Sequence, residues 1–211
     1  MRKHSLILLV ACTLLAALGA ATQEDGFVPI FNGENLDGWT GAVTENAVED
    51  GKLICGGGNL YTEKEYENFV FRFEFKTVKG GNNGVGIRAP LTGDAAYVGM
   101  EIQILDHDDP AYADIQPWQC HGSIYGVVAA KRVSLKPAGE WNTEEIYADG
   151  SRIKVTLNGE VIVDADIAKV EPVDGREHPG LHNERGHIGF LGHGHRFEMR
   201  NLRVKELPTG E

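Results

Sequence analysis

The sequence predicts a single all-β domain, a β-sandwich of the jelly-roll type. After the first 21 residues, no segment of useful length has helical spacing of apolar residues, whereas alternating segments recur between glycine-rich turns. The clearest is the segment 69–76, in which four phenylalanines alternate with mostly charged residues, as in an antiparallel strand with one buried face. The 27 glycines of the chain fit many tight turns.

Further strands are expected along the rest of the chain. Residues 152–164 are predicted to form a hairpin, because Asn158-Gly159 separates two alternating runs and Asn-Gly is the strongest short hairpin signal. The other expected strands are residues 52–55, 85–88, 98–105, 144–148, 187–191 and 197–206. Two long connections, 108–119 and 168–185, are rich in Pro, Asp and His, and loops of this length are usually functional or mobile.

The first 21 residues are predicted to be a signal peptide for export. A basic start precedes an apolar run, residues 6–18, which small residues follow. This run is short for a membrane span. The alternative is a lipoprotein anchored through Cys12, although the residues after this cysteine stay apolar where a lipid tether is usually polar. Residues 25–208 are then expected to form the folded domain, in the periplasm or outside the cell.

Composition limits the partners and the redox chemistry. The chain has 31 acidic and 20 basic residues, a net charge of −11, and loss of the basic start makes it more negative. This balance argues against binding to nucleic acid or to an anionic membrane surface. Cys55 and Cys120 remain after the signal peptide. In an exported protein they can form a disulfide, or they can be two buried thiols in separate strands.

The segment 81–106 contains the polar residues that best predict a site. Two strands built mostly of Val, Ile and Met also carry Arg88, Glu101 and Gln103. Buried charges cost several kcal/mol unless they are paired or lie in a wet cleft. Glu101 and Gln103 share one face of their strand. We therefore expect a polar cleft floored by a sheet, which suits a sugar better than a lipid or a nucleic acid.

Asp106 has two interpretations. A β-bulge near Leu105 would bring it to the face of Glu101, and the two carboxylates can then act as an acid and a base. Alternatively, Asp106 caps the turn at residues 107–110.

Arg88 and two asparagines also allow alternatives. Arg88 is expected to pair with Glu101, to donate to sugar oxygens or an enolate, or to do both. Asn82 and Asn83 can be turn residues, and for Asn82 this is the better interpretation.

Histidine and aromatic residues are weaker candidates. His121 lies between segments that contain tryptophan and tyrosine, and His193 and His195 precede the last strand. Two histidines one residue apart on a strand point the same way and can bind a metal. Trp118 and Tyr125 can stack on a sugar ring, although such residues more often belong to a core or rim. No cofactor is identified, and a divalent metal held by carboxylate and histidine is the one candidate.

Motifs along the whole mature chain resemble one family. The opening FVPIFNGENLDGW is similar to the FxxLFNGxxLxGW start of the 3-keto-disaccharide hydrolase domain family, long called a domain of unknown function. The further matches are GGNNGVGIR, YVGMEIQILD, GSIYG, KPAGEWN, LNGEVI and HIGFLGHGHRFEMRNLRVKEL. This resemblance implies a concanavalin A-like jelly roll, export, and cleavage of glycosides already oxidised at C3 of the sugar.

The resemblance also implies site residues. The polar motif positions of the family fall on Asn83, Arg88, Glu101, Gln103, Asp106, Tyr125 and His193. Family members commonly read LQDHG where this chain has Leu191-Gly192-His193-Gly194, so the acid of that motif has no counterpart here. The Glu-x-Gln-x-x-Asp pattern also resembles the Glu-x-Asp-x-x-Glu strand of laminarinase-type glucanases. Gln103 replaces the middle acid, which argues against ordinary retaining hydrolysis.

A ketone at C3 would make the hydrogen at C2 acidic, so that cleavage can proceed by elimination. Such a site needs a base near C2, donors for the enolate oxygen and an acid for the leaving oxygen. Water can then add to the unsaturated product, giving net hydrolysis. The residues expected for these roles are Glu101 or His193 as base, Arg88 with Gln103 as donors, and Asp106 or His121 as acid. The alternatives are a non-catalytic carbohydrate-binding module and a conventional glucanase-like glycoside hydrolase.

Overall fold

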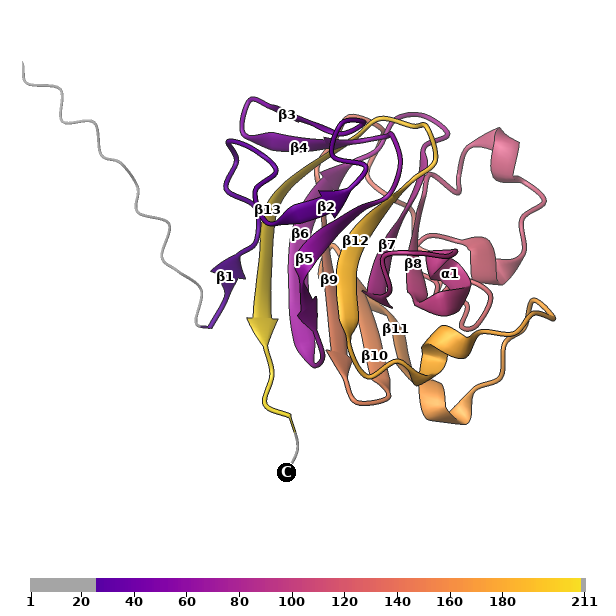
Figure 1. Cartoon of the computed structure of the whole chain (residues 1–211). Helices are drawn as coiled ribbons and strands as arrows, with labels where there is room; N and C mark the ends of the chain where they lie inside the picture. Colours follow the sequence, from indigo (N-terminus) through magenta and orange to yellow (C-terminus); the bar gives the residue numbers. More distant parts are fainter. Residues whose placement is uncertain (1–25, 210–211) are drawn as a thin grey trace, which may run out of the picture.

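The computed structural model describes residues 26–209, which form a sandwich of two antiparallel sheets (Figure 1). The larger sheet contains β1 (Val28–Pro29), β3 (Ala47–Glu49), β4 (Lys52–Cys55), β6 (Phe69–Lys76), β9 (Asn142–Asp149), β10 (Arg152–Leu157), β11 (Glu160–Asp166) and β13 (Phe197–Glu206). The smaller sheet has the order β2 (Trp39–Gly41), β5 (Leu60–Tyr66), β12 (Gly186–Gly192), β7 (Asn82–Ala89) and β8 (Met100–Leu105). The predicted all-β sandwich is confirmed.

Most expected strands form close to their predicted bounds. β4, β6 and β13 begin and end at the predicted residues. In the β10–β11 hairpin, Asn158 and Gly159 have φ of 49° and 88°, the left-handed conformations that a type I′ turn requires. The expected strand 98–105 is too long by two residues, because the short helix α1 (Ala95–Val98) takes its first position. The sequence does not predict β1, β2, β3 or β5.

The two long connections contain short 3₁₀ turns. The first connection contains η1 (Pro110–Tyr112) and η2 (Pro117–Gln119). At the second connection, η3 (Ile167–Lys169) overlaps the start and η4 (Pro179–His182) lies within it. Together with α1 they gather on one side of the sandwich, next to β7 and β8 (Figure 1). Within residues 26–209, no helix is long and apolar enough to cross a membrane.

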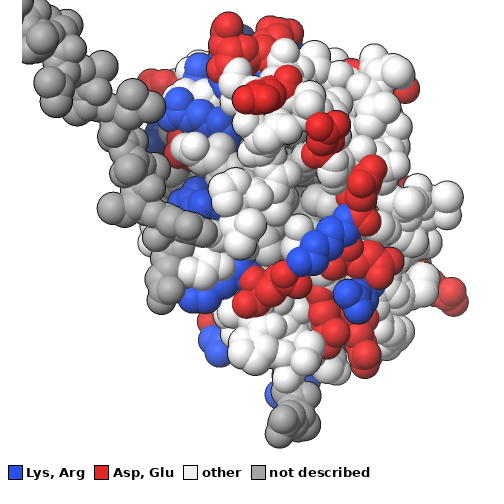
Figure 2. Space-filling model, turned by 60° about the vertical axis from the view of Figure 1, so that its left-hand side comes forward, with Lys and Arg blue, Asp and Glu red and all other residues white. Residues whose placement is uncertain are grey.

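The surface charges are interspersed. In Figure 2, acidic and basic side chains lie side by side on one face of the molecule. Several surface charges of the described residues are paired, as in the 2.8 Å contact between Arg152 Nη2 and Asp164 Oδ2 and the 2.7 Å contact between Arg196 Nη2 and Glu49 Oε2. Exposed pairs of this kind contribute only about 0–1 kcal/mol each to stability.

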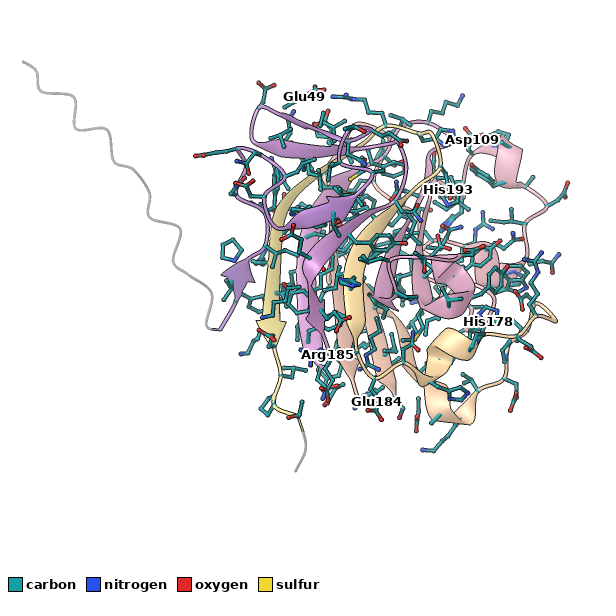
Figure 3. The ribbon with its side chains drawn as sticks, in the orientation of Figure 1. Glu49, Asp109, His178, Glu184, Arg185 and His193 are labelled. Carbon is teal, nitrogen blue, oxygen red and sulfur yellow. The ribbon has the colours of Figure 1, made fainter. Side chains whose placement is uncertain are left out.

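The core lies between the sheets, where side chains fill the space (Figure 3). The four phenylalanines of β6 point inward as predicted, and none is more than 1% exposed. Phe190 of β12 packs against them from the other sheet, with its ring 6.0 Å from that of Phe73. Truncating a buried phenylalanine to alanine typically costs 3–5 kcal/mol. This aromatic layer therefore holds the smaller sheet firmly against the larger one.

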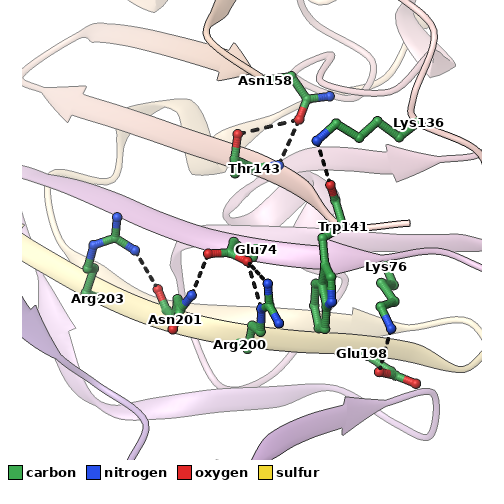
Figure 4. Close-up of polar contacts among 10 residues, drawn as sticks. All are labelled: Glu74, Lys76, Lys136, Trp141, Thr143, Asn158, Glu198, Arg200, Asn201 and Arg203. Atoms are coloured by element: carbon green, nitrogen blue, oxygen red, sulfur yellow. Dashed lines mark hydrogen bonds and ion pairs between the residues drawn. The ribbon is translucent and has the colours of Figure 1, made fainter. Parts of the chain in front are cut away.

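The outer face of the larger sheet is crosslinked by ion pairs (Figure 4). Arg200 Nη2 lies 2.6 Å from Glu74 Oε2, and Lys76 Nζ lies 3.5 Å from Glu198 Oε2. The Arg200 guanidinium also packs 3.9 Å from the ring centre of Trp141. These charged side chains thus pair with one another across neighbouring strands.

Cys55 and Cys120 are both buried free thiols, so the structure has the thiol alternative and not the disulfide. Cys55 lies in β4, and burial raises the pKa of its thiol. Cys120 follows η2 and is not in a strand. The predicted signal peptide and the lipidation alternative at Cys12 lie outside the described residues.

A buried polar cluster joins the two sheets. Nε2 of His121 lies 3.0 Å from Oε2 of Glu144 in β9, and both side chains are fully buried. The neighbouring His107 accepts a hydrogen bond on Nδ1 from the backbone N–H of His121 (3.1 Å). Burial, together with the charge of His121, lowers the pKa of His107 to about 4.

Lowering the pH from 6.5 to 4 is expected to destabilise the fold through His107. In the unfolded chain a histidine protonates with a pKa near 6.5, whereas folded His107 stays neutral down to about pH 4. The unfolded state therefore binds more protons in this window, and the free energy of unfolding falls by up to about 3 kcal/mol as the pH drops. Urea unfolding at a series of pH values measures this loss.

The variant His107→Asn keeps an acceptor for the His121 N–H and removes the titrating ring. The slope of its free energy of unfolding against pH is expected to be smaller than that of the native chain, by about the contribution of one proton. An identical pH dependence in both proteins would show that His107 is not a buried neutral histidine.

Candidate functional site

A polar cleft of about 190 Å³ opens where β7 and β8 meet the connections. It is lined by Asn82, Asp94, Ala96, Tyr97, Glu101, Gln103, Leu105, Tyr112, Ile115, Gln119, Tyr125 and His193. Glu101 and Gln103 are only 6% and 5% exposed, whereas the tyrosines are half-buried. The cleft thus has a buried polar floor and partly aromatic walls.

Glu101 reaches its position because β7 presents glycines opposite it. β7 and β8 pair with Gly86 beside Glu101 and Gly84 beside Gln103. A Cβ atom on Gly84 would lie 2.0 Å from Glu101 Oε1 and 2.7 Å from its Cδ. The glutamate side chain therefore occupies the space that any other residue at position 84 would fill.

The edge of β8 is completed by residues 122–125. Gly122 N donates to Gln103 O (2.7 Å), Gln103 N donates to Ser123 O (3.0 Å), and Tyr125 N donates to Glu101 O (2.9 Å). These bonds satisfy backbone groups that an edge strand would otherwise expose. They also fix Tyr125 directly beside the backbone of Glu101.

His193 follows β12 at the mouth of the cleft (Figure 3). Its Nε2 lies 3.9 Å from Glu101 Oε1, an ion-pair separation longer than a hydrogen bond. The Glu101 carboxylate raises the pKa of His193, against the opposing effect of burial, because it stabilises the protonated ring. The carboxylate of Glu101 and the imidazole of His193 thus face each other across the cleft.

Several buried oxygens in the cleft have no hydrogen-bond partner within the described chain. They are Asn82 Oδ1, Glu101 Oε1 and Gln103 Oε1. Buried polar groups are normally hydrogen-bonded, so unpaired acceptors on one wall favour a ligand that brings donors, as the hydroxyl groups of a sugar do.

The phenols of Tyr97 and Tyr125 can donate to a ligand. Tyr125 Oη accepts a hydrogen bond from Gln119 Nε2 (3.2 Å), and Tyr97 Oη accepts one from Arg176 Nη1 (2.7 Å). Each hydroxyl thereby keeps its own hydrogen for another partner. Tyr112 differs, because its hydroxyl already donates to Gly80 O (3.0 Å).

Arg88 does not pair with Glu101, and the prediction of such a pair is wrong. Arg88 is buried and donates to Glu67 O (3.0 Å), Gly150 O (2.8 Å) and Asn68 Oδ1 (3.2 Å), away from the cleft. Its φ of 47° turns the chain at the far end of β7. The guanidinium binds loop backbone and does not line the cleft.

Asp106 and His121 also lie outside the cleft. Over residues 82–105 the pairing of β7 with β8 runs from Asn82–Leu105 to Ile87–Met100 without a shift, so the bulge expected near Leu105 is wrong. Asp106 Oδ2 instead accepts a hydrogen bond from Gly80 N (2.9 Å), and Asp106 O accepts one from Asp109 N, as in the turn alternative. His121 points between the sheets, toward Glu144.

The two asparagines both lie in β7, and neither is where it was expected. Asn82 lies in β7 and lines the cleft, so the turn interpretation for this residue is wrong. Asn83 points the other way and is fully buried, and its Oδ1 accepts a hydrogen bond from Gly84 N (2.9 Å). The alternation of side chains along a strand separates these neighbours.

Trp118 and His195 do not line the cleft. The Trp118 ring packs edge-on against the Tyr125 ring, with ring centres 5.0 Å apart. His193 and His195 both lie between β12 and β13, so they do not share a strand as expected. Among residues 26–209, no group of three or more His, Cys, Asp and Glu side chains is placed to hold a metal ion.

Sequence reasoning missed the residues that form the walls, namely Asp94, Tyr97, Tyr112, Ile115 and Gln119. Asp94 had a readable signal, since aspartate before a short apolar run is a helix N-cap, and its Oδ1 accepts a hydrogen bond from Ala96 N (3.2 Å). The others lie in α1 and in the connection 108–119, which the sequence identifies as a functional loop without saying which side chains face the sheet.

A larger groove of about 860 Å³ lies beside β1 and β13. Its charged residues include Glu74 and Arg200, which bond to each other. The smaller cleft is therefore the better candidate, because its buried carboxylate faces a histidine rather than an arginine that neutralises it.

Comparisons with known proteins identify the family of the chain. Residues 26–205 match the model of the 3-keto-alpha-glucoside-1,2-lyase-like domain. A 3-keto-disaccharide hydrolase of Bacteroides thetaiotaomicron is 26% identical over 237 residues, covering 90% of this chain and 82% of that protein. A solved structure of a candidate glycosyl hydrolase from Parabacteroides distasonis has a TM-score of 0.77 at 29% identity, covering 86% of this chain and 99% of that chain.

A more distant neighbour shares only the fold. A carbohydrate-binding module of Bacillus subtilis has a TM-score of 0.55 at 14% identity, covering 80% of this chain and 96% of that one. The nearer relatives support a hydrolase-type enzyme with a glycoside hydrolase-like role. The chain belongs to the family of the 3-keto-alpha-glucoside-1,2-lyase-like domain.

Proposed function

We propose that this protein cleaves 3-keto-glycosides outside the cytoplasm, by removing the proton at C2 and eliminating the group at C1. The observation that carries the proposal is the buried Oε1 of Glu101, which has no hydrogen-bond partner among the described residues and faces His193 in a polar cleft. The family and the name of the Bacteroides relative support the substrate class. The basic and apolar start of the sequence supports export.

Glu101 is the base in this reaction. It takes the C2 proton, the electrons of that C–H bond form a C2=C3 double bond, and the ketone oxygen becomes an enolate. Within the described residues, the side chains that line the cleft include no lysine or arginine. The enolate oxygen therefore receives hydrogen bonds from neutral donors, and Tyr125 is placed for this by its bond to the Glu101 backbone.

His193 is the acid. The enolate re-forms the ketone and expels the oxygen at C1, which leaves a C1=C2 double bond, and the imidazolium of His193 gives its proton to the leaving oxygen. Water then adds at C1 while C2 regains a proton, so that the net reaction is hydrolysis. The unpaired oxygens of Asn82 and Gln103 accept hydrogen bonds from sugar hydroxyls during these steps.

Turnover of a 3-keto-glucoside in deuterated water tests the reaction type. Removal and return of the C2 proton is expected to leave deuterium at C2 of the released keto-sugar, as read by mass spectrometry. The matched ordinary glucoside is expected to stay intact, and free keto-sugar without enzyme measures slow background exchange. Cleavage without C2 exchange would favour a glucanase-like displacement, and binding without any cleavage would favour a carbohydrate-binding module.

Glu101→Gln is expected to reduce kcat on the 3-keto-glucoside by at least about 100-fold, because the base is lost. The pKa of His193, followed by NMR, is expected to fall toward its ordinary value, since Glu101 is what raises it. The melting temperature is expected to change little, because no arginine pairs with Glu101. The control Glu49→Gln alters an exposed carboxylate, and wild-type turnover by Glu101→Gln would contradict the assignment.

Gly84→Ala is expected to lower kcat by displacing Glu101 without removing it. The added Cβ would lie 2.0 Å from Glu101 Oε1, so the carboxylate has to leave its position. The matched control is Gly86→Ala, whose Cβ would lie 3.3 Å or more from its neighbours. Equal activity of the two variants would show that the position of Glu101 is not critical.

A further inference from the structure

The cleft is smaller than a disaccharide site needs to be. Its volume of about 190 Å³ lies below the roughly 300–1,000 Å³ of typical ligand pockets. The polar floor at Glu101 and Gln103 therefore has room for the oxidised sugar ring, and a ring attached to it has to lie against the walls at the mouth.

One wall of the cleft has the side chains that can pack against a sugar ring. Tyr97 of α1 and Ile115 of the connection 108–119 are half-buried and line the cleft. Tyrosine offers a flat face for stacking against the apolar face of a sugar, together with a hydroxyl for hydrogen bonding.

Tyr97 is held from behind by residues that do not line the cleft. Arg176 Nη1 donates to its hydroxyl (2.7 Å), and the guanidinium lies 5.0 Å from the ring centre. The ring of buried His178 packs 4.8 Å away at an interplanar angle of 57°. Figure 3 shows His178 next to α1. These contacts to both its ring and its hydroxyl restrict rotation of the Tyr97 side chain.

The segment that provides these contacts is itself anchored. His178 Nε2 lies 3.2 Å from both carboxylate oxygens of Asp174, and Asp174 Oδ1 accepts a hydrogen bond from Arg176 N (3.0 Å). Val173 N donates to Gly126 O (2.7 Å). Gly126 has a φ of 72°, and a Cβ there would lie 2.6 Å from Asp174 Oδ2. The second long connection is thus fixed against the residue that follows Tyr125.

The charge of the cleft restricts the ring that can bind. Asp94 and Glu101 contribute carboxylates, and the described lining residues include no lysine or arginine to attract an anion. An uncharged ring is therefore favoured over a uronic acid or a phosphorylated sugar.

We propose that Tyr97 forms a leaving-group subsite for an uncharged second sugar ring, and that Arg176 is the positioning residue that holds Tyr97 in place. This inference rests on the proposed function for the identity of the first ring. In this proposal, the connection 168–185 determines which glycosides are used, because its Arg176 positions Tyr97. It supplies no group to the bond-breaking steps.

The test compares a 3-keto-disaccharide with a glucose leaving group and methyl 3-keto-glucoside, which lacks a second ring. Tyr97→Ala is expected to lower kcat/KM severalfold, up to about tenfold, for the disaccharide and little for the methyl glycoside, because the second ring loses its aromatic contact. Arg176→Met and Tyr97→Phe are expected to lower kcat/KM for the disaccharide severalfold, because each removes the 2.7 Å hydrogen bond between Arg176 and Tyr97. Arg152→Met, which alters an exposed arginine on the β10–β11 hairpin, is the matched control.

Binding separates this proposal from the proposed function. NMR titration with the unoxidised disaccharide and with methyl glucoside needs no turnover, and the disaccharide is expected to lose affinity selectively in the three variants. Equal losses for both ligands, or none for either, would overturn the subsite even if cleavage occurs. A selective loss would establish it even if no 3-keto-glycoside is cleaved. If Tyr97→Ala does not fold, Tyr97→Phe and Arg176→Met decide the question.

Discussion

The close approach of β7 to the side chain of Glu101 is the constraint on which the cleft depends. A carboxylate that is 6% exposed on a sheet face needs space, and Gly84 provides it by having no side chain. The same pairing sets Gln103 next to Glu101 and places Asn82 farther along this face, opposite Leu105, since residues two apart share a face. The floor of the cleft therefore follows from one strand register. The aromatic layer behind it, centred on Phe73, stabilises that register by tying the smaller sheet to the larger one.

The sequence predicts those parts of the molecule that a local pattern determines. Alternating phenylalanines identify β6, Asn158-Gly159 identifies a hairpin, and Glu101 with Gln103 identifies the polar face of β8. The walls of the cleft follow no such pattern, because Tyr97 and Ile115 are placed by tertiary packing of irregular segments. β5 was also missed, since its central residues are charged and exposed and its apolar residues do not alternate.

The wrong assignments have a common physical cause. Arg88, Asp106 and His121 are polar residues near buried strands, which is the pattern that also suggests a site. Each instead finds a partner far from it in the sequence or in a turn: Gly150 O for Arg88, Gly80 N for Asp106, and Glu144 for His121. Buried polar groups need such partners whether or not they have a function. A lone sequence shows the polar group and not the partner, so it cannot separate structural burial from a site.

The charges of Glu101 and His193 couple the two proton transfers of the proposed reaction. With no lysine or arginine among the described lining residues, the positive charge available in the cleft is that of His193, and Glu101 stabilises it at 3.9 Å. When Glu101 takes the C2 proton, its charge is lost, and with it the interaction that raises the pKa of His193. His193 then becomes a stronger acid just after the base has acted, which is when the leaving oxygen requires a proton.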